Sequence, residues 1–215
     1  MFKVYLDFDD VISETFVALS AFAKAEFGRT PVPDKQIHFD LRESLGIPDA
    51  EYGRFMDRFH AEMLEDIPEM PGAAAAMRGW MENGAAEPVV VTGRPFSAHG
   101  ASVRWLERRG LGAVQVLHVD KYARFGGETA GVVQFAALAG MGFRFAVDDA
   151  PAALDALCRA GFAEVVAFSR PWNAAWAQPA DSAPGLPPPV RVASWTELDA
   201  AVRRAAAAPL SAKPV

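Results

Sequence analysis

The chain has 215 residues and a formal net charge of −6 at pH 7, with 51% hydrophobic and 22% charged residues. This length and composition predict a globular protein of one domain, or of one domain with a modest insert. The acidic balance argues against a nucleic-acid polymer as a partner and against binding to an acidic membrane surface.

The first predicted strand, Val4 to Phe8, is short and apolar and runs into a group of acidic residues. Thr15 to Phe27 and Asp49 to Leu64 carry apolar side chains at helical spacing, which predicts two helices. Two prolines mark Ile67 to Gly72 as a linker. The sequence therefore predicts a helical insert over residues 13–70, directly after the first strand.

After the linker, helices and strands alternate regularly. The expected helices are Ala73 to Glu82, Ala101 to Arg109, Thr129 to Ala139 and Ala152 to Ala160, and the strands that follow them in turn are Pro88 to Val91, Val114 to Val119, Phe143 to Val147 and Glu164 to Phe168. A last strand, Val190 to Ala193, and a last helix, Trp195 to Ala206, are expected near the C-terminal end. This alternation predicts a parallel sheet with helices on both faces.

The expected fold is thus an α/β, Rossmann-like open parallel sheet with a small helical cap inserted after its first strand. The core would comprise residues 1–12 and 71–208, the cap residues 13–70, and the Ala-rich residues 209–215 would be a disordered tail. In open α/β sheets, ligands bind outside the carboxyl ends of the strands. The cap leaves the core at that edge, so we expect it beside the ligand site.

Four predicted strands end in polar residues, which a parallel sheet brings to one edge. They are Asp7 and Asp9 after the first strand, Thr92 and Gly93 after the second, Asp120 and Lys121 after the third, and Asp148 and Asp149 after the fourth. Asp7 and Asp9 are two residues apart, so on a strand their side chains point the same way. Crowded carboxylates repel one another, and keeping them ionised requires a cation. A hard divalent ion such as Mg²⁺ fits these oxygen ligands.

The same edge offers groups that suit a phosphate. Lys121 adds a positive charge, Thr92 offers a hydroxyl, and Gly93 lets a ligand approach backbone N–H groups closely. Lys121 is the only lysine between Lys35 and Lys213. Phosphoryl transfer needs positive charge and donors around the phosphate, together with an in-line nucleophile such as a carboxylate. The strand ends therefore predict phosphoryl transfer.

The order and spacing of these residues resemble the haloacid dehalogenase-like phosphotransferase superfamily. The matching motifs are Val4-Tyr5-Leu6-Asp7-Phe8-Asp9, then Val89-Val90-Val91-Thr92-Gly93, then Lys121, and last Phe145-Ala146-Val147-Asp148-Asp149. The resemblance covers the chain from about Phe2 to Phe168, and the insert looks like the family's C1 cap, which closes over small substrates. Within the superfamily the chain is most similar to the 5′(3′)-deoxyribonucleotidase-like group. That similarity lies in Met70-Pro71-Gly72 and in Ala150-Pro151 after the acidic pair, although Asp10 stands where the group usually has glycine.

The resemblance implies a role for each site residue. Asp7 would be the nucleophile that becomes an aspartyl phosphate, and Asp9 the general acid and then the general base. Asp7, the backbone carbonyl of Asp9 and Asp148 would hold Mg²⁺, with Asp149 as a direct or second-sphere ligand. Thr92 and Lys121 would bind the phosphoryl oxygens. The implied activity is that of a Mg²⁺-dependent phosphatase acting on a small phosphorylated substrate.

Several alternatives remain open from the sequence. A nucleoside monophosphate is the favoured substrate, and sugar phosphates and phosphoglycolate-like acids are the alternatives. A phosphoacceptor signalling module uses similar groups, but it lacks a second aspartate at the position of Asp9 and has no cap. A catalytically silent binding protein would show losses in the motifs, and a dehalogenase needs no Mg²⁺ cage. The oligomeric state leaves no readable signal.

Some residues near the expected site have no assigned role. These are Arg94, Arg124 and the loop Arg170 to Trp176, while Phe16, Phe96 and Trp172 are candidates for stacking on a base. The single cysteine, Cys158, excludes an intrachain disulfide, and the sequence shows no signal segment and no unbroken apolar run of membrane-spanning length. We therefore expect a cytoplasmic protein without a membrane partner.

Overall fold

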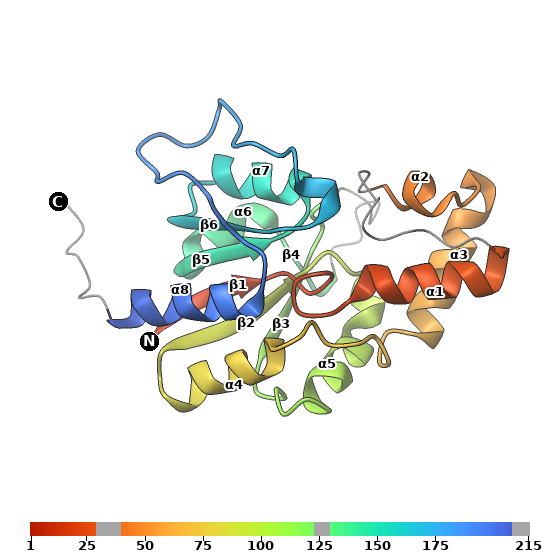
Figure 1. Cartoon of the computed structure of the whole chain (residues 1–215), viewed down its shortest axis with the longest axis horizontal. Helices are drawn as coiled ribbons and strands as arrows, with labels where there is room; N and C mark the ends of the chain where they lie inside the picture. The colour runs from red at the N-terminus through yellow and green to blue at the C-terminus, as the bar shows by residue number, and fades with distance from the viewer. Residues whose placement is uncertain (29–39, 123–129, 208–215) are drawn as a thin grey trace.

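The computed structural model describes residues 1–28, 40–122 and 130–207, and its centre is a sheet of parallel strands (Figure 1). Within these residues the sheet has seven strands in the order β4-β3-β2-β1-β5-β6-β7. The strands are β1 (Phe2–Leu6), β2 (Ala86–Thr92), β3 (Gln115–Val119), β4 (Val132–Val133), β5 (Phe143–Asp148), β6 (Glu164–Phe168) and β7 (Val190–Val192). The predicted Rossmann-like α/β class is confirmed. The predicted tail, residues 209–215, and Arg124 lie outside the described residues.

Helices lie on both faces of the sheet and beyond one of its ends (Figure 1). They are α1 (Thr15–Phe27), α2 (Leu41–Leu45), α3 (Asp49–Glu62), α4 (Ala73–Glu82), α5 (His99–Glu107), α6 (Phe135–Leu138), α7 (Pro151–Arg159) and α8 (Trp195–Ala207). One face is covered by α4, α5 and α8, and the other by α6 and α7. The remaining helices, α1, α2 and α3, lie together beyond the carboxyl end of β1 (Figure 1).

Two apolar cores hold these layers together, because successive residues of a strand face opposite sides of the sheet. Val4 and Leu6 of β1 belong to the larger core, and Tyr5 between them belongs to the smaller one. The larger core contains three fully buried tryptophans, one each from α4, α5 and α8: Trp80, Trp105 and Trp195. The near-continuous burial of β1, β2 and β5 on both faces fixes the strand ends in space, and these ends carry the polar residues.

The insert is joined to the core by two connections that run side by side. The backbone N–H of Glu14 donates to the carbonyl of Pro68 at 2.8 Å, and that of Met70 donates to the carbonyl of Ile12 at 3.0 Å. Buried tryptophan Nε1 groups of α5 and α8 donate to carbonyl oxygens of the same connections. The base of the insert is therefore fixed against the core, while the boundaries at residues 12 and 70 stay a prediction.

The prediction was wrong for the helix Thr129 to Ala139. Thr129 lies outside the described residues, and the chain then forms the short strand β4 before the single-turn helix α6. Gly131 has a φ of 74°, which breaks a helix, and the β-branched pair Val132–Val133 favours extended backbone. The short helix α2 was not predicted at all. Among the described residues, no helix combines the length and apolarity needed to span a membrane.

Candidate active site

The predicted strand ends meet where the strand order of the sheet reverses. Strand β1 lies between β2 and β5, and successive later strands are added outward on either side of it. Asp7 follows β1 directly, and its backbone N–H donates to the carbonyl of Val147 in β5 at 2.9 Å. Asp148 ends β5. Ligands of open α/β sheets bind at such a switch point, outside the carboxyl ends of the strands.

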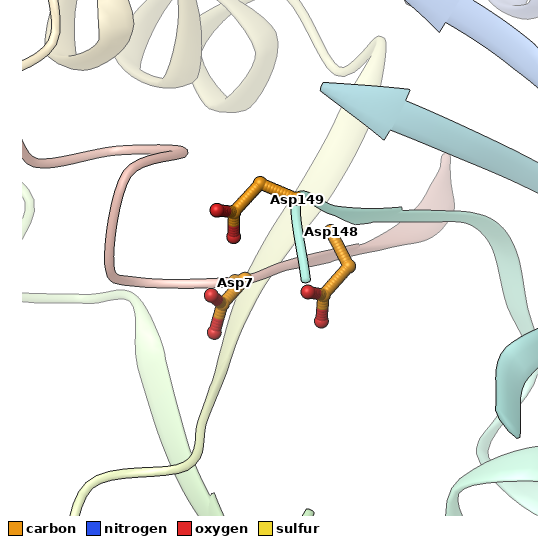
Figure 2. Close-up of side chains that lie close together, drawn as sticks. All are labelled: Asp7, Asp148 and Asp149. Carbon is orange, nitrogen blue, oxygen red and sulfur yellow. The ribbon is translucent and has the colours of Figure 1, made fainter. Parts of the chain in front are cut away.

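Three carboxylates gather at this point. Oxygen atoms of Asp7, Asp148 and Asp149 lie within 4.8 Å of one another, and all three residues are buried. Figure 2 shows their side chains, one from the end of β1 and two from the end of β5. Burial raises the pKa of Asp7 to about 8, although Lys121 opposes that shift. Burial, together with the charge of Asp7, also raises the pKa of Asp149 well above its ordinary value.

Lys121 lies against this group of carboxylates. Its Nζ donates to Asp7 Oδ1 and to Asp148 Oδ2, both at 2.7 Å, and its side chain is fully buried. Burial opposes the charge on Lys121, but Asp148 and Asp7 raise its pKa well above the ordinary value. With all three carboxylates ionised, the single ammonium leaves an excess of negative charge. An all-oxygen donor set with this excess fits a hard divalent cation such as Mg²⁺.

Further hydrogen bonds orient the two carboxylates of β5. Asp148 accepts from the Tyr5 hydroxyl at 2.9 Å, and Asp149 accepts from Trp172 Nε1 at 2.8 Å. Neither partner was predicted. Tyr5 precedes Asp7 by two residues and therefore shares its side of β1, which is a signal that the sequence did contain. Trp172 is 23 residues from Asp149 in sequence, and no local pattern links them.

Asp9 stands apart from the three carboxylates and is held by a different set of donors. Its oxygens accept from Arg94 at 2.6 Å and from the Thr15 hydroxyl at 2.6 Å. Arg94 is itself buried and lies 3.8 Å from the centre of the Phe8 ring. Burial alone would raise the pKa of Asp9, but Arg94 outweighs it and the net pKa is lowered. The role of Arg94, which the sequence left open, is thus to orient Asp9 and keep it ionised.

The predicted phosphate-binding residues take different positions. Gly93 lines the cavity described below, whereas Thr92 is fully buried, is not among the cavity's lining residues, and accepts the backbone N–H of Arg94 at 3.1 Å. A Cβ added at Gly93 would lie 3.0 Å from the ring of Tyr122. The absence of a Cβ at Gly93 therefore lets the Tyr122 ring pack closely against the backbone. The structure brings Lys121 to the carboxylates, but phosphate binding by Thr92, Gly93 and Lys121 stays a prediction.

A cavity of about 410 Å³ opens over these groups. Core residues that line it include Asp7, Asp9, Gly93 and Asp149, and helices α1 and α3 of the insert contribute Phe16, Met56, Asp57 and His60. The insert helices thus form a wall opposite the strand ends. Their own packing rests on aromatic contacts, because the ring of Phe22 in α1 lies 5.4 Å from that of Phe55 in α3.

Asp10 and the loop after β6 complete the rim. Asp10 has a φ of 57°, a conformation that glycine adopts easily and aspartate tolerates. Its carboxylate accepts the backbone N–H of Phe16 at 3.0 Å, and its carbonyl accepts from Arg170 at 2.6 Å. Burial raises the pKa of Asp10 to about 7. The ring of Trp172 lies 5.3 Å from that of Phe16, so the loop after β6 joins the cavity wall.

No protein-family model matches the chain, and no match was found among curated proteins. Solved structures do match. A conserved haloacid dehalogenase-like protein of unknown function from Agrobacterium tumefaciens has a TM-score of 0.60 and 12% identity, covering 96% of this chain and 100% of that one. A haloacid dehalogenase family hydrolase from Deinococcus radiodurans, with bound phosphate and sodium, has a TM-score of 0.57 and 16% identity, covering 95% and 96%.

A third structure, a haloacid dehalogenase superfamily hydrolase of subfamily IA from Geobacter sulfurreducens, has a TM-score of 0.56 and 17% identity, covering 94% of this chain and 96% of that one. These similarities extend over nearly the whole of each chain at low sequence identity. They show that the chain has the haloacid dehalogenase-like fold, and that its structural neighbours include hydrolases of that superfamily.

Proposed function

We propose that this protein is a Mg²⁺-dependent phosphatase that hydrolyses small phosphomonoesters through an aspartyl phosphate on Asp7. The observation that carries the proposal is the group formed by Asp7, Asp148 and Asp149, whose oxygens lie within 4.8 Å, with Lys121 at 2.7 Å from two of them. Asp7 and Asp149 of this group line a cavity of small-molecule size. The phosphate bound to the Deinococcus radiodurans hydrolase supports the proposal that this fold binds a phosphorylated substrate.

Each side chain has a defined part in the proposed reaction. Asp7 attacks phosphorus through Oδ2, since Lys121 holds Oδ1. Asp9 gives a proton to the leaving oxygen and later takes one from the water that hydrolyses the intermediate. Bound Mg²⁺, held by Asp7, the Asp9 carbonyl and Asp148, with Asp149 beside them, would neutralise the charge of the carboxylates and of the phosphoryl oxygens.

The position of Asp9 bears on this proton transfer. Arg94 lowers the pKa of Asp9, which suits a base but opposes a general acid. A phosphate dianion arriving beside Asp9 raises the pKa of the carboxylate again, because like charges favour its neutral form. Asp9 would therefore take up its proton as the substrate binds and regain its ionised form after the leaving group departs.

Removal of Mg²⁺ tests the proposal directly. The purified protein is expected to hydrolyse p-nitrophenyl phosphate with Mg²⁺ present, because crowded carboxylates and a phosphate dianion repel one another without a cation. Activity should disappear in EDTA and return when Mg²⁺ is added in excess. Undiminished turnover after thorough chelation would rule out the proposed site.

The size of the cavity favours a small substrate. Its volume of about 410 Å³ lies in the range of small-ligand pockets, and α1 and α3 wall it off on the side opposite the strand ends. A wall that excludes water and bulky groups suits a small soluble phosphomonoester better than a phosphoprotein or a polynucleotide. Efficient hydrolysis of a folded phosphoprotein would contradict this part of the proposal.

Among small substrates we favour a nucleoside monophosphate. Phe16 and Trp172 place two aromatic rings on the cavity wall, where a base would stack. The resemblance of Met70-Pro71-Gly72 and of Ala150-Pro151 to the nucleotidase-like group supports the same choice. The measurement is kcat/KM for deoxynucleoside monophosphates, hexose phosphates and phosphoglycolate. A preference of tenfold or more for sugar or acid phosphates would remove the nucleotide proposal and leave the phosphatase proposal intact.

A further inference from the structure

Among the described residues that line the cavity, the cationic side chains are paired and one carboxylate is not. Two cationic side chains of the described residues line the cavity, and each is already paired. Arg94 bonds Asp9 at 2.6 Å, and Arg42 bonds Asp40 at 2.6 Å. Asp57, on α3, also lines the cavity and has no ion pair or hydrogen bond within residues 1–28, 40–122 and 130–207. The described wall therefore offers an unpaired anion and no unpaired cation.

His60 lies one helical turn from Asp57, on the same wall. Its ring nitrogens have no hydrogen bond to any described residue, and the side chain is partly buried. Burial, with Arg94 nearby, lowers the pKa of His60, so the ring is neutral at pH 7. A neutral imidazole has one donor and one acceptor nitrogen, and both suit a hydroxyl group.

We propose that the alcohol released from the substrate is uncharged and bears hydroxyl groups that Asp57 and His60 bind, and that this wall rejects alcohols carrying a carboxylate or a second phosphate. The inference rests on the proposed phosphatase function and concerns the leaving group alone. A hydroxyl donating to the Asp57 carboxylate makes a charge-assisted hydrogen bond.

An anionic leaving group would be repelled by Asp57. It would leave water to lie near the unpaired Asp57, where each described cation of the cavity lining is already engaged. Like charges a few ångströms apart repel by about 1 kcal/mol or more even in a well-solvated site, which corresponds to roughly fivefold or more in binding. A nucleoside and a hexose are both uncharged, so the inference is independent of the choice between them.

A matched pair of substrates tests the inference. We expect kcat/KM for 2-hydroxyethyl phosphate to exceed that for phosphoglycolate by at least about fivefold, because the two differ chiefly in the charge of the group opposite the phosphate. The ratio should fall as the salt concentration rises, since part of the effect comes from the exposed Asp57. Equal efficiency, or a preference for phosphoglycolate, would overturn the inference.

Two variants test whether Asp57 causes the preference for 2-hydroxyethyl phosphate over phosphoglycolate. Asp57→Asn keeps the shape and removes the charge, so the ratio should fall by at least about threefold, mainly through improved use of phosphoglycolate. The control is Glu62→Gln, which removes the same charge from α3 at a residue that pairs with Arg58 and does not line the cavity. Its ratio should stay at the wild-type value. A ratio that Asp57→Asn leaves unchanged, or that Glu62→Gln lowers equally, would overturn the assignment.

Different results would contradict the phosphatase proposal and the inference about the leaving group. If p-nitrophenyl phosphate is hydrolysed with Mg²⁺ but phosphoglycolate is used as well as 2-hydroxyethyl phosphate, the inference about the leaving group falls and the phosphatase proposal stands. If no phosphomonoester is hydrolysed, the phosphatase proposal fails and the inference fails with it.

Discussion

Replacing Asp7 with asparagine is expected to abolish turnover, with a loss of at least about 10⁴-fold, as for other covalent nucleophiles. The amide is a poor nucleophile and cannot form the acyl phosphate. It also removes one of the three carboxylates whose oxygens lie within 4.8 Å. Both the covalent step and the site for the cation are therefore lost with one atom exchanged.

The measurement is phosphate release from p-nitrophenyl phosphate in the presence of Mg²⁺, together with trapping of the phosphorylated protein by acid quench. Wild-type protein should yield an acid-stable, hydroxylamine-sensitive phosphoenzyme, and Asp7→Asn should yield none. The matched control is Asp66→Asn, the same chemical change at an exposed carboxylate that pairs with Arg108. A variant Asp7→Asn that keeps near-full activity, with a melting temperature close to wild type, would overturn the assignment of the nucleophile.

The sequence was sufficient to place the carboxylates and the lysine because their arrangement depends on topology. Asp7 and Lys121 come after β1 and β3, and Asp148 ends β5. The parallel pairing of the strands brings these ends to one edge. No side-chain detail is needed for that step. The helix boundaries Thr15–Phe27 and Ala73–Glu82 were likewise predicted correctly. Apolar spacing and the following Gly28 define the first helix, and the linker Ile67 to Gly72 marks the start of the second.

The sequence was not sufficient for contacts that depend on side-chain conformation between distant residues. Arg94 and Asp9 are 85 residues apart, and their pairing follows from the path of the chain after β2, which no local pattern encodes. The same holds for Trp172 and Asp149. The failure at Thr129 to Ala139 has another cause, since apolar residues in a short segment fit a helix and a strand equally well.

The contact between Arg94 and Asp9 changes what is expected of Asp9. A carboxylate held by a buried guanidinium at 2.6 Å and by a hydroxyl at 2.6 Å has one orientation, toward the cavity. Orientation of this kind favours proton transfer at a fixed position, and it separates Asp9 from the three carboxylates grouped around Lys121. We therefore propose that the Asp9 side chain serves proton transfer, and that only its backbone carbonyl is a ligand of the cation.

Asp9→Asn is accordingly expected to slow both half-reactions, by roughly 10²–10⁴-fold for the loss of a general acid and base. The two steps should respond differently to the leaving group. p-Nitrophenolate departs without a proton, so phosphorylation of Asp7 by p-nitrophenyl phosphate should be slowed much less than phosphorylation by an alkyl phosphate. Hydrolysis of the phosphoenzyme should keep the full slowing with either substrate, because the attacking water must still give its proton to a base.

With p-nitrophenyl phosphate, the variant should therefore release a burst of nitrophenolate that approaches one per protein and then turn over slowly, with phosphoenzyme accumulating. The measurement is rapid-quench kinetics of nitrophenolate and of protein-bound phosphate. With 2-hydroxyethyl phosphate, protein-bound phosphate alone is measured, and no rapid accumulation of phosphoenzyme is expected. Arg94 loses its charged partner in this variant, so a melting curve with Mg²⁺ serves as the folding control. Equal slowing with both substrates and no accumulated phosphoenzyme, in a protein that melts like wild type, would contradict the acid–base role of Asp9.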